Sequence, residues 1–225
     1  VEAFIKTDLY NPKRQMLGEE QEAWLQQALQ SSKARGATWQ VLGQQVLMGK
    51  LNIPVIPPEE LAKLELSEYA RPRVAQTQRL APYGLPSNLD AWDGYPAARE
   101  RLFAMLSAHA TNPISLAGDT HNGWAFNLTN QKGEAVGVEW GTPGVSSPGL
   151  ENYVPLPPDQ MQELLKGASP ELVACDTSQR GWTQVTLTPE AATAQWRFVS
   201  SVTEPSYQTS AGEPLVTPRN ARKLA

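Results

Sequence analysis

The sequence contains one cysteine, Cys175, so no disulfide can form within the chain, and cysteine usage does not reveal the redox compartment. Cys175 follows an apolar run at residues 172–174 and has no basic neighbour in the sequence. A reactive thiol needs an electropositive, partly exposed environment. We therefore expect a buried, inert thiol rather than a nucleophile or a metal ligand.

Long apolar runs and an excess of charge are also missing. No apolar run approaches the roughly 18 residues of a membrane-spanning helix. The net charge of −4 over 225 residues gives no reason to expect binding to nucleic acid or to an anionic membrane surface. Residues 1–20 lack a charged segment followed by an apolar one, so we expect no signal peptide. A chain that starts without Met is typical of a fragment or a processed product.

Hydrophobic periodicity predicts a mixture of helices and strands, and hence an α/β fold. We expect helices at residues 19–32, 58–61, 96–109 and 158–166, and strands at residues 1–5, 38–43, 134–140, 183–188 and 195–202. Gly167 is expected at the C′ position of the last helix. Residues 44–92 are predicted to be mostly a Pro-rich connection, and so long a connection is usually functional or mobile. We expect residues 1–203 to form the folded part and residues 204–225 an irregular tail.

The segment Gly118-Asp119-Thr120-His121 lies between two apolar runs, residues 114–117 and 124–128, which predicts a strand, a tight turn and another strand. In an extended chain, residues i and i+2 point to the same face, so Asp119 and His121 would project together from a strand end. A carboxylate oxygen beside an imidazole nitrogen suits a metal ion used for hydrolysis. The alternative is a surface carboxylate and a solvated imidazole at an ordinary turn.

Further segments occur in a fixed order around this turn: Arg14–Gly18, then Asp93–Pro96 with Arg99 and Arg101, then Gly141–Pro148, and finally Arg180–Trp182. Together they make residues 12–203 resemble the C-terminal half of the PhoD-like alkaline phosphatase/phosphodiesterase family, which are calcineurin-type metallophosphoesterases. The resemblance implies part of a four-layer αββα sandwich, with a mixed sheet flanked by helices and the metals at the carboxyl ends of strands.

The resemblance also implies a chemistry. Asp119 and His121 would be catalytic metal ligands for iron and calcium in the hydrolysis of phosphate mono- or diesters, and His121 would donate its other ring N–H to a neighbouring acceptor. The family's remaining ligands come from N-terminal motifs that this sequence lacks. We therefore expect a missing N-terminal half or a second chain to complete the site, and residues 1–225 alone to be inactive. The resemblance implies a periplasmic or secreted protein. The alternative is a non-catalytic fragment or accessory domain that keeps the fold.

Four other residues are candidates with open alternatives. Asn122 could contact the phosphoryl group or close the turn. Tyr95 could face the substrate, because a helix at 96–109 that runs antiparallel to the next strand would return it to the end of the sheet where Asp119 lies. Alternatively, its ring could pack beneath the start of that helix. Asp93 could support the metal ligands or face the substrate, or it could be the N-cap of the following helix. Arg99 could support the ligands or meet the phosphate, or it could be a charge on the helix surface.

Overall fold

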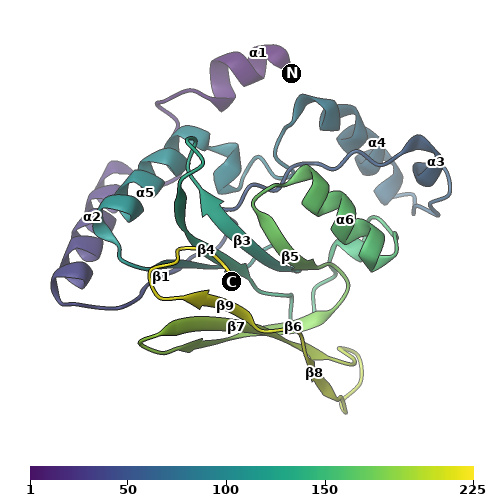
Figure 1. The fold of residues 1–225 in the computed structure, drawn as a ribbon. Helices are drawn as coiled ribbons and strands as arrows, with labels where there is room; N and C mark the ends of the chain where they lie inside the picture. The colour runs from purple at the N-terminus through teal and green to yellow at the C-terminus, as the bar shows by residue number, and fades with distance from the viewer.

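The computed structural model describes residues 1–225, and a five-stranded mixed sheet lies at its centre (Figure 1). Its strands are β1 (Gln40–Gly43), β2 (Pro113–Ala117), β3 (Gly123–Thr129), β4 (Ala135–Gly141) and β5 (Leu172–Asp176). The spatial order is β1-β2-β4-β3-β5; β1, β2 and β4 are parallel, whereas β3 is antiparallel to both of its neighbours. Because β4 lies between β2 and β3, the turn that joins those two strands must cross the carboxyl end of β4.

A second sheet of four antiparallel strands lies against one face of the first. It consists of β6 (Arg180–Leu187), β7 (Ala191–Val199), β8 (Thr209–Ala211) and β9 (Leu215–Pro218). The opposite face of the first sheet is covered by α2 (Glu19–Ala34), α5 (Pro96–His109) and α6 (Pro158–Ala168) (Figure 1). The chain thus forms three layers of an α/β sandwich, helices on sheet on sheet.

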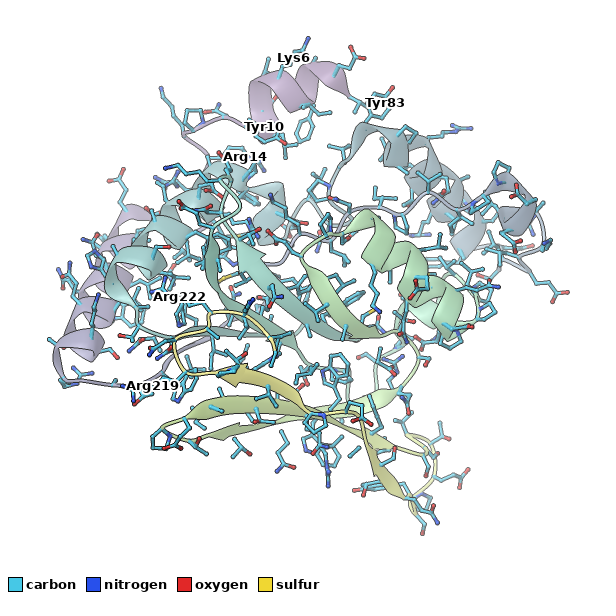
Figure 2. All side chains as sticks on the ribbon, in the orientation of Figure 1. Lys6, Tyr10, Arg14, Tyr83, Arg219 and Arg222 are labelled. Atoms are coloured by element: carbon cyan, nitrogen blue, oxygen red, sulfur yellow. The ribbon has the colours of Figure 1, made fainter.

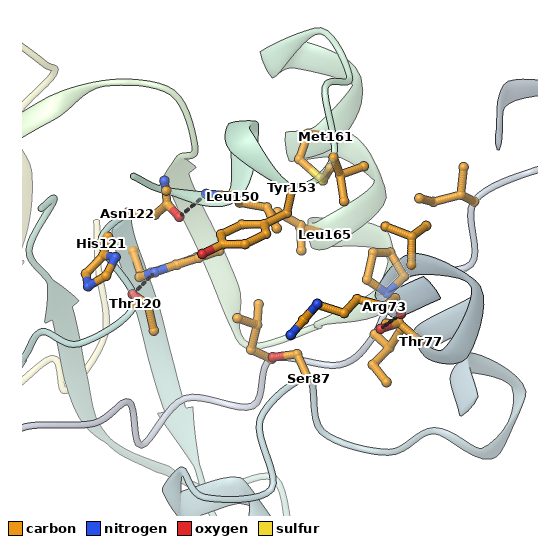
Figure 3. Close-up of a pocket in the computed structure, with 18 of the residues that line it drawn as sticks. Arg73, Thr77, Ser87, Thr120, His121, Asn122, Leu150, Tyr153, Met161 and Leu165 are labelled. Carbon is orange, nitrogen blue, oxygen red and sulfur yellow. Dashed lines mark hydrogen bonds between the residues drawn. The ribbon is translucent and has the colours of Figure 1, made fainter. Parts of the chain in front are cut away.

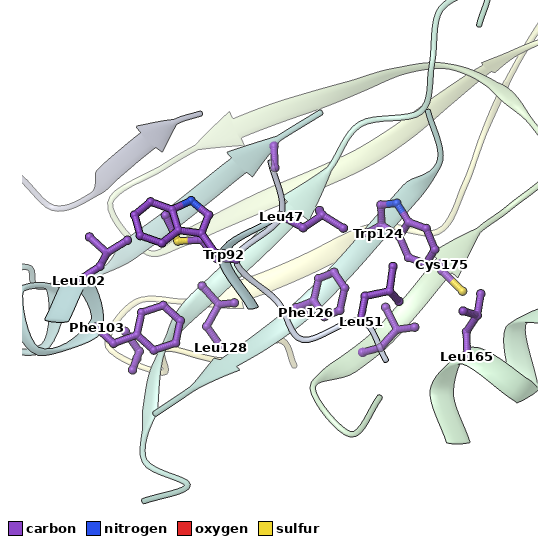
Figure 4. Packing of buried hydrophobic residues seen from close by; sticks show 14 of the residues in the cluster. Leu47, Leu51, Trp92, Leu102, Phe103, Trp124, Phe126, Leu128, Leu165 and Cys175 are labelled. Atoms are coloured by element: carbon purple, nitrogen blue, oxygen red, sulfur yellow. The ribbon is translucent and has the colours of Figure 1, made fainter. Parts of the chain in front are cut away.

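The alternation of side chains along β3 explains these layers. Trp124, Phe126 and Leu128 point to the helices and join the larger hydrophobic core, which Figure 4 shows together with side chains from α5 and α6. Ala125, between them, belongs to the smaller core under Trp196 of the second sheet. A strand that is buried on both faces has a continuous apolar sequence, so apolar and polar residues do not alternate along β3.

The remaining helical segments are short or peripheral: α1 (Glu2–Phe4), a π-helical turn at Ile5–Leu9, α3 (Pro58–Leu61), α4 (Ala70–Leu80), and 3₁₀ turns at Ala81–Tyr83, Trp92–Gly94 and Leu150–Asn152. None of the helices combines the length and the apolar character that crossing a bilayer requires.

The structure confirms most of the expected elements and corrects several. Residues 1–5, predicted as a strand, begin a short helix. Helix α4 and strand β5 were missed; α4 buries only Ala70 and Val74, so its polar sequence carries almost no periodic signal. Gly167 lies inside α6 and not beyond its end.

The predicted irregular tail at residues 204–225 is also wrong, because β8 and β9 both pair with β7. Beyond β9 the chain returns to the first sheet. The guanidinium of Arg222 donates to the carbonyl oxygens of Ala110 and Thr111 at 2.7 and 3.3 Å, and Figure 2 shows this side chain beside that layer. Leu224 is buried in the smaller core. Long-range pairing, which sequence periodicity does not report, therefore makes the tail part of the fold.

Part of the predicted connection, residues 48–52, crosses the helix-facing side of the sheet and is fixed by buried side chains. Its backbone amides donate in turn, Met48 and Gly49 to Glu139, Lys50 to Glu171, Leu51 to Asp93, and Asn52 to Ser169, over 2.7–3.0 Å. Gly49 leaves no room for a side chain, since a Cβ there would lie 2.2 Å from the ring of Phe126. We call residues 48–52 the crossing segment.

Candidate active site

The turn Gly118–Asn122 sits over the carboxyl end of β4, as the strand order requires. It is tied to two other segments by backbone hydrogen bonds: Gly118 N–H donates to the carbonyl of Gln45 at 2.9 Å, and Gly144 N–H donates to the carbonyl of His121 at 2.9 Å. The turn is therefore held on both sides, by the residues that follow β1 and by those that follow β4.

The backbone of this turn differs from the extended conformation on which the pairing of Asp119 and His121 was predicted. Their φ angles are 66° and 63°, so both residues occupy the left-handed region. L-residues adopt that region at a cost, and such strain concentrates at functional sites. Asp119 and His121 therefore do not share a face through alternation along a strand, as was predicted, although both residues lie on one short turn. Asp119 is exposed and its carboxylate has no hydrogen-bond partner in the chain, whereas His121 is half-buried.

The orientation of the His121 ring is fixed by the loop after β4. Its Nδ1 lies 2.8 Å from the carbonyl oxygen of Pro148. A carbonyl oxygen only accepts hydrogen bonds, so Nδ1 carries a proton, and in the neutral ring Nε2 keeps its lone pair. This confirms the expected contact of His121 with a neighbouring acceptor. A metal-binding imidazole generally uses such a contact to fix its tautomer.

Arg180, at the start of β6, holds the same residue from the second sheet. Its Nη1 donates to the carbonyl of His121, and its Nη2 lies 2.5 Å from Oε1 of Glu151. The next residue, Gly181, donates its N–H to the carbonyl of Gly144 at 2.9 Å. A side chain at Gly181 would collide with the backbone, because its Cβ would lie 1.9 Å from the carbonyl oxygen of Arg197. The Arg-Gly pair thus fastens the turn and the adjoining loop to the second sheet.

Asn122 is buried and hydrogen-bonds to the loop that follows β4. Its Oδ1 accepts a hydrogen bond from the N–H of Leu150 at 3.0 Å, while its Nδ2 has no partner. Oε2 of Glu151 is also buried and unpaired. Both atoms lie close to Gly149, where a Cβ would be 2.5 Å from the first and 2.6 Å from the second. Of the two alternatives for Asn122, the hydrogen bond to Leu150 favours closing the turn.

The other three sequence candidates lie elsewhere. The first turn of α5 packs against the β3–β4 hairpin: Arg99 donates to the carbonyl of Thr129 at 3.2 Å, and Glu100 accepts from the N–H of Gln131 at 3.1 Å. This is the end of β3 opposite to Gly123, where the Gly118–Asn122 turn enters. The geometric expectation for Tyr95, one helical turn before Arg99, is therefore wrong. A short connection fixes where a helix ends, but not the angle at which it crosses a sheet.

Tyr95, Asp93 and Arg99 have structural contacts instead. The guanidinium of Arg14 stacks 4.1 Å from the ring centroid of Tyr95. Arg99 is buried and pairs with Glu171 at 2.6 Å while donating to the carbonyl of Met48. Asp93 accepts from the crossing segment, and burial raises the pKa of its carboxyl to about 7. None of the three contacts the Gly118–Asn122 turn.

A cavity of about 360 Å³ opens beside His121 (Figure 3). Thr120, His121 and Asn122 line one side, and the Thr120 hydroxyl accepts a 2.6 Å hydrogen bond from the indole N–H of Trp124 in its wall. Across the cavity lies Arg73 of α4, and the ring of Tyr153, on the loop before α6, lies between Arg73 and the turn. Neither residue was a candidate from the sequence, and the helix that carries Arg73 was not predicted. Arg180 belongs to a motif of the resemblance but had no predicted role.

The chain alone does not gather a complete metal centre. No group of three or more His, Cys, Asp or Glu side chains is placed so that it could hold a metal ion. Cys175 lies under α6, and burial raises the pKa of its thiol to about 12. Asp119 and His121 are thus the two ligand-type side chains that the turn presents.

Comparison with known proteins identifies the family of this chain. A family model described as PhoD-like phosphatase matches residues 2–196. This chain belongs to the PhoD-like phosphatase family. Alkaline phosphatase D of Bacillus subtilis (strain 168) is 31% identical over 205 residues, which cover 89% of this chain and 29% of that protein. A solved structure described as "Structure of PhoD" is 27% identical with a TM-score of 0.68 and matches 96% of this chain and 36% of its own.

These matches confirm both the predicted resemblance and the α/β metallophosphoesterase-like sandwich. The PhoD-like chain spans about a third of the length of the two relatives it matches.

Proposed function

We propose that this chain is the part of a PhoD-like phosphoesterase that supplies Asp119 and His121 to a metal centre for the hydrolysis of phosphate mono- or diesters. The family match supports a phosphatase, and one observation supports the roles of these residues. The Pro148 carbonyl binds the proton on Nδ1 of His121 and leaves Nε2 free, on the same turn as an exposed, unpartnered carboxylate.

The two donors fit the metals that the resemblance implies, iron and calcium. Carboxylate oxygen is a hard ligand suited to either ion, and a neutral imidazole nitrogen suits iron. When bound, such ions polarise the phosphoryl oxygens and lower the pKa of bound water. This chain's contribution is to orient His121. The Pro148 carbonyl holds its ring and Arg180 holds its backbone carbonyl, so the imidazole is already ordered before the ion binds.

The remaining ligands, on this proposal, come from an N-terminal half or from a second chain, and residues 1–225 alone do not turn over substrate. The proposal also includes a periplasmic or secreted location for the complete protein, which rests on the resemblance alone. The competing proposal is a non-catalytic domain that keeps the fold without a working centre, and the two make different predictions for metal binding.

The test uses the two histidines of the sequence, His109 and His121, as internal references for each other. Nitrogen NMR of the imidazoles is recorded while Fe(III) or Ca(II) is added to the chain. We expect Fe(III) to broaden the signals of His121 and to leave those of His109 sharp. Asp119→Asn should weaken this effect, whereas Asp90→Asn, a change at an exposed carboxylate without a side-chain partner, should not.

Equal broadening of both imidazoles, or identical metal content in Asp119→Asn and the unaltered chain, would favour the non-catalytic domain. Turnover is measured separately with p-nitrophenyl phosphate. Robust hydrolysis by residues 1–225 that disappears in His121→Ala and persists in His109→Ala would show that the chain needs no second part.

A further inference from the structure

The cavity beside His121 is a mainly apolar chamber with one fixed charge. Its walls come from the crossing segment and the residues after it, from α4, from the loop before α6 and from α6 itself. The apolar side chains that contribute include Leu51, Ile53, Val74, Trp124, Met161 and Leu165. No Asp, Glu or Lys lines it. A chamber of this size and character is typical of a site for a small organic group.

The fixed charge is the guanidinium of Arg73. It makes no salt bridge with any carboxylate of the chain. The side chain is exposed, but its positions are limited because it stacks 3.6 Å above the ring centroid of Tyr69 and donates to the Tyr69 carbonyl at 3.0 Å. The Tyr69 ring in turn lies 6.2 Å from that of Tyr153. A pre-oriented cation without a counter-ion is a binding element for an anion.

Arg73 and His121 lie on opposite sides of the chamber. Figure 3 shows the guanidinium pointing into the cavity from α4, with the Tyr153 ring between it and the turn that carries His121. A molecule that reaches from one to the other would pass along an apolar and aromatic wall and would end at a positive charge.

We propose that this chamber binds the alcohol portion of the substrate, and that this alcohol has an apolar or aromatic body with a second anionic group, a carboxylate or a phosphate, recognised by Arg73. Calling this portion the leaving alcohol rests on the proposed function, because the proposed function places the scissile phosphate at the His121 end of the chamber. The binding itself requires neither metal nor turnover.

The polar side chains at the distal end of the chamber differ in whether they are already bonded: the Thr77 hydroxyl donates to the Arg73 carbonyl at 2.7 Å. At the distal end Thr77 and Ser87 accompany Arg73, whereas Gln78 is already bound to the backbone of Ile56 and Pro54. Arg73 is therefore the group that discriminates between a charged and a neutral ligand. Burial of the ligand body supplies affinity, and Arg73 supplies specificity.

Four phenols that differ only in the group opposite the hydroxyl test the proposal: 4-hydroxyphenylacetate, 4-hydroxybenzylphosphonate, neutral 4-ethylphenol and cationic tyramine. Their binding to metal-free residues 1–225 is measured by titration calorimetry. We expect one or both anions to bind about tenfold more tightly than 4-ethylphenol, and tyramine more weakly. The preference between the two anions identifies the carboxylate or the phosphate.

Arg73→Met should bring the anions to the affinity of 4-ethylphenol. The control is Arg79→Met, a change at another exposed arginine of α4 that does not line the chamber. Val154→Phe should weaken all four phenols by filling the wall. The proposal is overturned if 4-ethylphenol binds as tightly as the anions, if Arg79→Met acts like Arg73→Met, or if no phenol binds. Loss of metal binding or turnover in other assays leaves this outcome unchanged and bears only on the proposed function.

Discussion

Nδ1 of His121 lies 2.8 Å from the carbonyl oxygen of Pro148, 27 residues further along the chain. This contact makes the loop after β4 part of the candidate site, because it determines which nitrogen of the ring is free. It also gives the candidate site a spectroscopic signature.

The neutral His121 ring should be the Nδ1–H tautomer, since only a protonated nitrogen can donate to Pro148. Long-range nitrogen–proton NMR correlations at pH 8 distinguish the two tautomers. His109, which has no hydrogen-bond partner for its ring, serves as the reference in the same spectrum and should show mainly the tautomer of the free amino acid. An Nε2–H tautomer at His121 would contradict the ligand orientation described here.

Arg180→Met should lower the free energy of unfolding by about 2–3 kcal/mol, because the buried guanidinium is replaced by a group that cannot hydrogen-bond and Glu151 loses its partner. Urea denaturation provides the measurement, and the NMR signals of His121 should shift with it. Arg219→Met, at an exposed arginine whose side chain makes no hydrogen bond, is the matched control. A change below about 0.5 kcal/mol would show that the contact does not stabilise the turn.

Stability should depend on pH through Asp93. Burial raises the pKa of this carboxyl from 3.8 to about 7, so between these values the folded state holds a proton that the unfolded chain has lost. The native state then binds more protons, and the contribution of Asp93 to stability falls as pH rises from about 4 to about 7.

Asp93→Asn removes this titration while its Oδ1 can still accept from Leu51. As pH rises from 4.5 to 8, the free energy of unfolding of the variant should therefore increase relative to that of the unaltered chain, by on the order of 2–4 kcal/mol. Burial also raises the pKa of Glu139, but that group is present in both proteins and largely cancels in the comparison. Parallel stability curves for the two proteins would refute the assignment.

Cys175 should react with a thiol reagent only when the structure opens. Burial raises the pKa of the thiol to about 12, and the side chain lies in the larger core. We expect labelling at pH 8 to be at least about a thousandfold slower than in urea-unfolded chain. Since it is the one cysteine, the labelling signal is unambiguous. Rapid labelling of the native protein would place it at an accessible surface.

Features that depend on neighbouring residues can be predicted from the amino-acid sequence of this protein. The helix at Pro96–His109 follows from Pro96 and a periodic apolar face, and the strands on either side of the Gly118–His121 turn follow from two short apolar runs. The types of donor at the candidate site, a carboxylate and an imidazole on one turn, are also a property of the sequence, as is the resemblance that pointed to the PhoD-like family.

How those donors are held, and what lies beside them, depends on contacts between segments that are distant in the sequence. Arg180 reaches His121 across 59 residues, and the crossing segment is fixed by carboxylates that lie far from it in sequence. Because of the same long-range packing, Tyr95 lies away from Asp119 and Arg73 lies opposite His121. Periodicity reports only which face of an element is buried. The crossing angles of helices and the pairing of distant strands arise from contacts between segments that no local pattern encodes.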